Sequence, residues 1–167
     1  TENAVRSVTD LNKAMTLVDM TMSNMSGSSL YSLKQQSLSM AKDLSAATKT
    51  VTDAVTIYAN ENESVSSMLN KAQPTVLLSA ASGMSSSSSA DAIQGILNQF
   101  NLSEDQAMHV ADTVEKLSSE IALDFSKGCD TISQSIATSG SVVNEAGMSF
   151  EKYAALVSTT AEKTRVS

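Results

Sequence analysis

Apolar residues recur at alternating intervals of three and four along the first part of the chain. One series is Ala4, Val8, Leu11, Met15, Val18, Met22 and Met25, and the next is Leu30, Leu33, Ser37, Met40, Leu44, Ala47, Val51, Ala54 and Tyr58. Heptad spacing of this kind places an apolar stripe along one side of a helix. The cluster Ser26–Ser29 between the two series predicts a turn with a helix N-cap.

Residues 1–60 are therefore predicted to form either an antiparallel helical hairpin or one long interrupted helix that pairs with another subunit as a coiled coil. The simpler interpretation of the methionines at 15, 22 and 25 is core packing, although a methionine stripe also suits adaptable partner contacts. We predict that the surface used for packing or self-association in a homo-oligomer consists of Val8, Leu11, Met15, Val18, Met22, Met25, Leu33, Met40, Leu44 and Val51.

Residues 61–89 contain stronger helix-breaking signals and predict short helices with a Ser-rich segment. Pro74 disfavours the helical state at the residue before it, which divides the segment into helices over 65–72 and 75–81, closed by Gly83. The five serines at 85–89 are either a flexible linker or the N-cap of the helix that follows.

Residues 90–167 are predicted to form a bundle of helices over 90–100, 104–121, 126–146 and 150–164. Ser103 and Gln106 have the spacing of a capping box, and Gly147 suits the position that closes a helix. Gly128 and Gly140 weaken the third helix, and Gly140 marks a candidate break. No segment alternates as a strand would, so the fold class is all-α.

Composition narrows the classes of function. The formal net charge is −7 and the pI is about 4.6, which disfavours sequence-independent binding to nucleic acid. The apolar runs are too short to cross a membrane, and the single Cys129 cannot form an intrachain disulfide. Because the chain begins at Thr1 rather than at a methionine, we expect it to be a fragment of a longer protein.

Candidate chemistry is sparse. His109, Asp112 and Glu115 share one side of a predicted helix, but one histidine with two exposed carboxylates is a poor zinc site. Cys129 would need a histidine base, and the single histidine stands on another predicted helix, so a buried structural thiol is the favoured interpretation. We predict that the protein is not an enzyme and has no catalytic, cofactor-binding or metal-binding residues.

From Tyr58 onward the sequence resembles the core region of the phage tail tape-measure family. The likeness lies in a helix that ends in Gln99-Phe100, a capped helix with an aspartate, a helix with an internal glycine, and the turn Ala146-Gly147-Met148-Ser149-Phe150-Glu151 into an Ala-rich helix. It is carried by residues 73–83, 93–100, 101–105, 111–115, 124–128, 140–151, 154–156 and 162–165. The first 57 residues match only in style.

The resemblance implies a structural protein of a phage or prophage tail. It implies a helical rod in the lumen of the tail tube or at the tail tip, made in the host cytoplasm, that sets tail length and leaves with the DNA at genome ejection. Its implied partners are the tube protein, tail tip or baseplate proteins and tail assembly chaperones.

Two other classes of function stay open at this point. A coiled-coil signalling or secretion-associated module would use only the N-terminal heptads, and the breaks at Pro74, Gly83, Gly128, Gly140 and Gly147 count against it. A metal-dependent hydrolase around His109 would require bound metal, which metal analysis of the purified chain would detect.

Overall fold

A computed structural model describes residues 2–22, 25–121 and 124–165, with only the backbone described for 2–6 and 164–165. Over this part of the chain, eight α-helices and one short 3₁₀ turn follow one another without a strand, which confirms the all-α class. They are α1 (Glu2–Thr21), α2 (Gly27–Asp43), α3 (Thr48–Asn60), α4 (Val65–Ser82), α5 (Ser86–Gln99), η1 (Glu104–Gln106), α6 (Ala107–Glu120), α7 (Phe125–Glu145) and α8 (Phe150–Arg165). The predicted seam position Ala4 and the motif residues Thr164 and Arg165 have side chains outside the described set.

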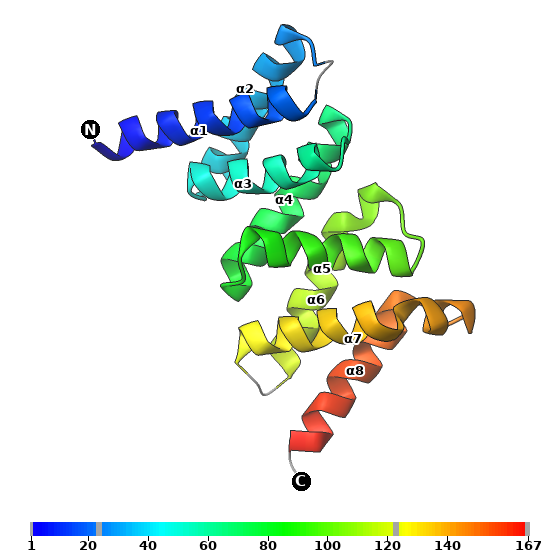
Figure 1. The fold of residues 1–167 in the computed structure, drawn as a ribbon. Coiled ribbons are helices and arrows are strands. Elements are labelled where there is room, and N and C mark those ends of the chain that lie inside the picture. The colour runs from blue at the N-terminus through cyan, green and yellow to red at the C-terminus, as the bar shows by residue number, and fades with distance from the viewer. Residues whose placement is uncertain (1, 23–24, 122–123, 166–167) are drawn as a thin grey trace.

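The helices form a two-layered stack of four consecutive pairs (Figure 1). In one layer α1 lies on α3, α3 on α5 and α5 on α7, while in the other α2 contacts α4, α4 contacts α6 and α6 contacts α8. Each helix also packs against its neighbours in sequence. The repeating unit of about forty residues and its quasi-linear stacking are typical of α-solenoids.

Five of the turns between helices share one design. In each of them, the residue three positions before the first residue of the next helix has a positive φ. These residues are Ser45 (φ 50°), Asn62 (φ 58°), Gly83 (φ 73°), Asn101 (φ 50°) and Gly147 (φ 82°). In four of the five, a serine then directly precedes the helix: Ser64, Ser85, Ser103 and Ser149. The hydroxyls of Ser64 and Ser85 accept the backbone N–H of the third helical residue, and the predicted Ser103–Gln106 capping box is present. The left-handed residue reverses the chain, and the serine starts the next helix.

Some of the predicted helix boundaries differ from the observed ones. The run from Leu30 to Tyr58 is not one helix, because the chain turns over 44–47 between α2 and α3. Leu44 and Ala46 remain partly buried within that turn, so the apolar spacing continues through it and hides the break. The predicted hairpin of two helices is not confirmed, since α1 packs mainly on α3 and only weakly on α2. Pairing of this region with another subunit as a coiled coil stays a prediction.

Pro74 does not divide α4, which continues from Val65 to Ser82 with the proline buried inside it. A proline removes one helical hydrogen bond, and the packing of α3, α5 and α6 around α4 compensates for that loss. The serines at 85–89 form the N-cap and first turn of α5 rather than a linker. Gly140 does not break α7, which is continuous through both of its glycines.

The buried apolar side chains fall into two clusters. The first belongs to α1–α4 with Ala90 of α5, and the second belongs to α5–α8 with Leu78 of α4. We call α1–α4 the N-terminal half and α5–α8 the C-terminal half. The three-residue turn Gly83–Ser85 joins the two halves.

Candidate functional site

The predicted packing surface lies mostly inside the N-terminal half of one chain. Five of its residues are buried in the first cluster: Leu11, Met15, Val18, Leu33 and Val51. Four more are partly buried against that cluster: Met22, Met25, Met40 and Leu44. Val8 is 55% exposed. These side chains pack α1, α2 and α3 together within a single chain. Their use between copies of the chain stays a prediction.

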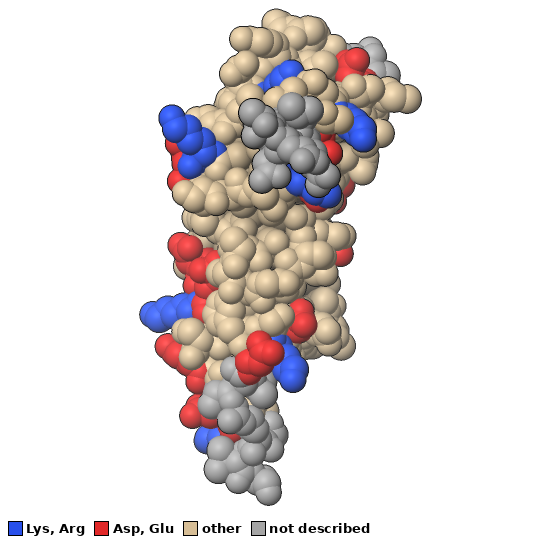
Figure 2. All heavy atoms as spheres, turned by 90° about the vertical axis from the view of Figure 1, so that its left-hand side faces the viewer, with Lys and Arg blue, Asp and Glu red and all other residues tan. Residues whose placement is uncertain are grey.

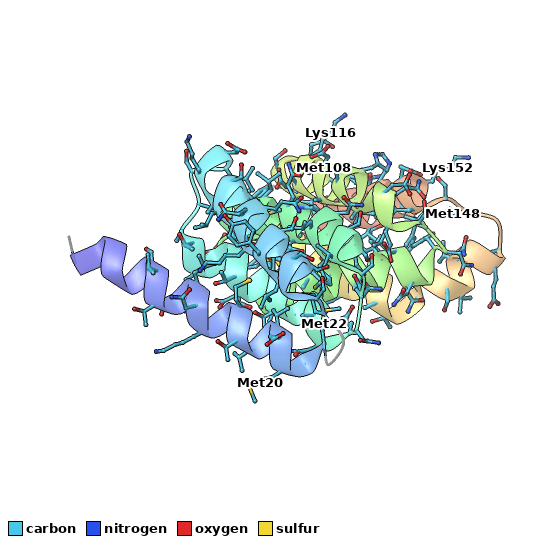
Figure 3. All side chains as sticks on the ribbon, turned by 90° about the horizontal axis from the view of Figure 1, so that it is seen from above. Met20, Met22, Met108, Lys116, Met148 and Lys152 are labelled. Atoms are coloured by element: carbon cyan, nitrogen blue, oxygen red, sulfur yellow. The ribbon has the colours of Figure 1, made fainter. Side chains whose placement is uncertain are left out.

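The methionines at the end of α1 lie apart from those near α6 and α8. Met20 is 74% exposed on α1. Seen from above the stack, Met20 and Met22 lie on the opposite side of the molecule from Met108, Lys116, Met148 and Lys152 (Figure 3).

A buried lysine lies at the centre of a polar cluster that contacts three helices. The Lys71 side chain, 2% exposed, pairs with Glu63 in the α3–α4 turn and donates to Oε1 of Gln94 on α5 at 2.8 Å. Its ammonium lies 4.9 Å from the centroid of the Tyr58 ring, and the Tyr58 hydroxyl bonds Thr75 at 2.7 Å. The cluster ties together α3, α4 and α5.

Burial dominates the electrostatics of this cluster. It lowers the pKa of Lys71, with Glu104 and Glu61 acting in the opposite direction. Burial also raises the pKa of Tyr58 to about 12, so the phenol stays neutral and acts as a hydrogen-bond partner. A buried amine with a carboxylate beside it is a chemical candidate, but Glu63, Gln94 and Tyr58 already occupy the space around the Lys71 ammonium where a substrate would have to bind.

A second junction joins α5 to α7. The Gln99 amide bridges two backbone groups of α7: its Oε1 accepts from the Ser141 N–H at 2.7 Å, and its Nε2 donates to the Ala137 carbonyl at 3.5 Å. An α-helix normally pairs those two groups with each other. Gly140 favours this close approach, because a Cβ there would lie 3.0 Å from Gln99 Cβ and 3.1 Å from Phe100 Cε2.

The aromatic residues complete this junction. The Phe100 ring lies 5.8 Å from Phe150, edge to face, and 6.3 Å from Tyr153. The Tyr153 hydroxyl bonds Ser139 and the Ser135 carbonyl of α7. The Gln99-Phe100 pair, the internal glycine and the Gly-x-Ser-Phe turn, which carried the resemblance from separate parts of the sequence, thus meet in one place.

The candidate metal residues do not gather. His109 bonds Glu151 of α8 at 2.9 Å, with both side chains about half exposed. Burial, followed by the neighbouring Asp112, raises the pKa of Glu115. No group of three or more metal-ligand side chains is gathered in residues 2–22, 25–121 and 124–165.

Cys129 is fully buried in the C-terminal cluster, and burial raises the pKa of its thiol. The thiol therefore has little thiolate character at neutral pH, and the side chain of His109 is engaged with Glu151.

The described surface carries an open groove and a broad uncharged area (Figure 2). The open groove of about 480 Å³ between α1, α3 and the start of α5 has balanced charges, with Asp10, Lys13, Lys49 and Asp53 on its walls. On the face shown in Figure 2, charged side chains are scattered over the upper and lower parts and along the edges, and a broad area across the middle is uncharged. Among the described helices, none has the length and apolarity to span a bilayer.

Together these features define an all-helical protein built as a stack of helix pairs. The sequence profile of the phage-related minor tail proteins matches residues 34–167, and the chain belongs to that family. The match begins earlier than the resemblance from Tyr58 and takes in part of α2. No curated protein and no solved structure shows a significant match to the chain.

Sequence reasoning missed two features that the structure makes plain. The contact of Lys71 with Gln94 and the contacts of Gln99 with Ala137 and Ser141 have no local signal, because these residues become neighbours only through the stack. The stack itself had a sequence signal: Asn62-x-Ser64, Asn101-x-Ser103 and Gly147-x-Ser149 recur roughly forty residues apart.

Proposed function

We propose that this chain is a segment of a phage tail tape-measure protein, which sets the length of the tail during assembly and leaves the tube with the DNA. Membership of the minor tail protein family is the observation that carries the proposal. The ordered tape-measure motifs add to it, since they converge on the α5–α7–α8 junction.

The charge distribution fits passage beside DNA. Residues 83–167 carry eleven Asp and Glu against five Lys and Arg, whereas residues 1–82 carry seven against six. An excess of negative charge repels the phosphate backbone. In this proposal the partners are the tube protein, tail tip or baseplate proteins, assembly chaperones and further copies of the same chain.

The architecture makes the ruler proposal quantitative. A residue adds about 1.5 Å to a continuous helix, whereas a whole pair in a stack adds only the spacing of packed helices, about 10 Å. A segment that measures length while extended therefore contributes several times more per residue than one that stays folded.

The test is deletion of residues 86–124 from the parent gene, followed by measurement of tail length by electron microscopy. The deletion removes α5 and α6 and leaves Ser85 to cap α7 in place of Asp124. Tails shorter by about 60 Å identify an extended ruler, and tails shorter by about 10 Å identify a ruler that stays stacked.

A matched control replaces the deleted pair with an unrelated helical hairpin of equal residue number, which should restore full length. Full-length tails from the deletion itself would show that this segment does not measure length and would contradict the proposal.

A further inference from the structure

The exposed large apolar side chains lie at the two ends of the stack. In the described residues, seven of them have exposed fractions between 36% and 74%, and all seven stand on the first or the last helix pair: Val8, Leu17, Met20, Tyr31 and Leu38 on α1 and α2, and Val142 and Leu156 on α7 and α8. The four helices between these pairs, α3 to α6, are fully described and carry none. In Figure 1 the first pair forms the top of the stack and the last pair forms the bottom.

Net charge has the opposite distribution. Residues 1–43 carry four acidic and four basic side chains, and residues 125–167 also carry four of each. Residues 44–124 carry ten acidic and three basic side chains, so the whole net charge of −7 belongs to the middle of the chain. Two ends can therefore approach each other without net repulsion, whereas two middle regions placed side by side would repel.

Part of the apolar surface at the N-terminal end lies along the joint between α1 and α2. Lys34 of α2 donates to Oδ1 of Asn12 on α1 at 2.8 Å, which marks this joint. Val8 stands one turn before Asn12, and Leu38 stands one turn after Lys34, so both belong to the sides of their helices that meet there. Both are exposed, whereas the sides of α1 and α2 that pack on the second pair are buried. The two side chains therefore face outward from the end of the stack.

The C-terminal end has a matching arrangement at the joint between α7 and α8. The hydroxyl of Tyr153 on α8 bonds that of Ser139 on α7. Val142 and Leu156 each stand one turn beyond one of these two residues, and their exposed fractions are 66% and 52%. Each end of the stack thus presents a joint between two helices with an exposed apolar side chain on either helix.

Stacking of one end on the other would continue an arrangement that the chain already contains. Within the chain, each pair packs on the next through the contacts α1–α3, α3–α5 and α5–α7 in one layer and α2–α4, α4–α6 and α6–α8 in the other. Figure 1 shows α1, α3, α5 and α7 running in the same direction. A second copy can therefore place its α7 on α1 and its α8 on α2 with the same helix directions. Stacked repeat proteins need terminal units with a polar outer side to stay soluble, and the exposed apolar side chains at both ends depart from that pattern.

From these observations we infer that copies of this chain stack end to end, with the α7–α8 end of one copy on the α1–α2 end of the next. The contact joins two different surfaces, so it leads to an open row of copies or to a closed ring. The inference concerns self-association and does not depend on a role in length control.

Sedimentation velocity on the whole chain, over concentrations from about 1 µM to about 1 mM, tests the end-to-end contact. The unaltered chain should form dimers and larger species as its concentration rises. Val8→Glu with Leu38→Glu blocks the N-terminal end, and Val142→Glu with Leu156→Glu blocks the C-terminal end, because each pair of substitutions places unpaired charge in an apolar contact. Either double variant alone should remain a monomer, since the contact needs one end of each kind.

Mixing the two double variants distinguishes end-to-end stacking from other kinds of association. Each variant supplies the end that the other lacks, so the mixture should form dimers and nothing larger. The matched control Gln73→Glu with Asn98→Glu adds the same charge at exposed positions of α4 and α5, and it should associate as the unaltered chain does.

An unaltered chain that stays monomeric at every concentration would overturn the inference. So would association that is lost only when the N-terminal end is blocked, because that end would then pair with itself, and so would an equal loss in the control variant. Circular dichroism checks the folding of each variant, and its helical signal should not change because the substituted side chains are exposed. If a double variant loses that signal, the single substitutions Leu38→Ser and Leu156→Ser apply the same criterion.

Discussion

The two halves have similar helix pairs but different cores. The N-terminal cluster is built largely from Val, Ala, Leu and Met, with Tyr58 as its aromatic residue, whereas the C-terminal cluster contains five isoleucines and two phenylalanines among its buried residues. The C-terminal half also brings helices into close contact at Gly128 and Gly140. Methionine adapts to irregular gaps, while branched and aromatic side chains against glycine fix one arrangement. The comparison teaches that the C-terminal half has the more uniquely determined packing.

Truncating the aromatic centre of the C-terminal half is expected to have the largest effect. Phe150 is 1% exposed and contacts Phe100 edge to face, so Phe150→Ala should lower the free energy of unfolding by about 3–5 kcal/mol. Urea denaturation measures this, with Tyr31→Ala as control, since Tyr31 is 65% exposed and its loss should cost no more than about 0.5 kcal/mol. If the two variants lowered the free energy of unfolding equally, Phe150 would not be the core residue that this comparison takes it to be.

The close contact at Gly140 gives the next largest effect. Gly140→Ala places a methyl group against Gln99 and Phe100, and should cost about 1–3 kcal/mol through overpacking. Gly95→Ala is the matched control, because Gly95 also lies inside a helix but has nothing within 4 Å of the position that a Cβ would take. There the gain in helix propensity should stabilise the chain by about 0.5–1 kcal/mol. Gly140→Ala should thus lower the urea midpoint and Gly95→Ala should raise it. A higher midpoint for Gly140→Ala would contradict the expected steric overlap with Gln99 and Phe100.

The surface pair between α6 and α8 should have the smallest effect. His109 lowers the pKa of Glu151 through a hydrogen bond, so the Glu151 carboxylate contributes stability above its ordinary pKa of 4.5 and loses it as pH falls through the lower folded value. Because both side chains are about half exposed, Glu151→Gln should cost less than about 1 kcal/mol at neutral pH. The difference from the unaltered chain, measured by thermal unfolding across pH, should vanish in acid; a difference that grows in acid would reverse the assigned sign.

Local signals predicted the C-terminal half well. Ser103, Gln106 and Gly147 mark helix ends through hydrogen bonds within a few residues, and the predicted helices over 104–121, 126–146 and 150–164 lie close to the observed ones. The heptads of the N-terminal half identified buried positions such as Leu11 and Val51. They could not reveal the turn at 44–47 or the packing of α1 on α3, because periodicity marks the apolar side of a helix and does not specify its partner.

The contacts that hold the helix pairs together could not be predicted from local sequence propensity either. By local propensity Gly140 weakens its helix, yet its missing side chain is what admits Gln99. By the same criterion Pro74 ends a helix, yet packing on several sides keeps α4 continuous. Both outcomes follow from tertiary contacts that override local propensity.

The most direct test of the proposed role is tail length after residues 86–124 are duplicated in tandem in the parent gene. A gain in length cannot arise from general damage to the protein, unlike a loss. The proposal predicts infectious particles whose tails are longer by about 60 Å if the segment is extended, or by about 10 Å if it stays stacked. Infectious particles with tails of unchanged length would contradict it.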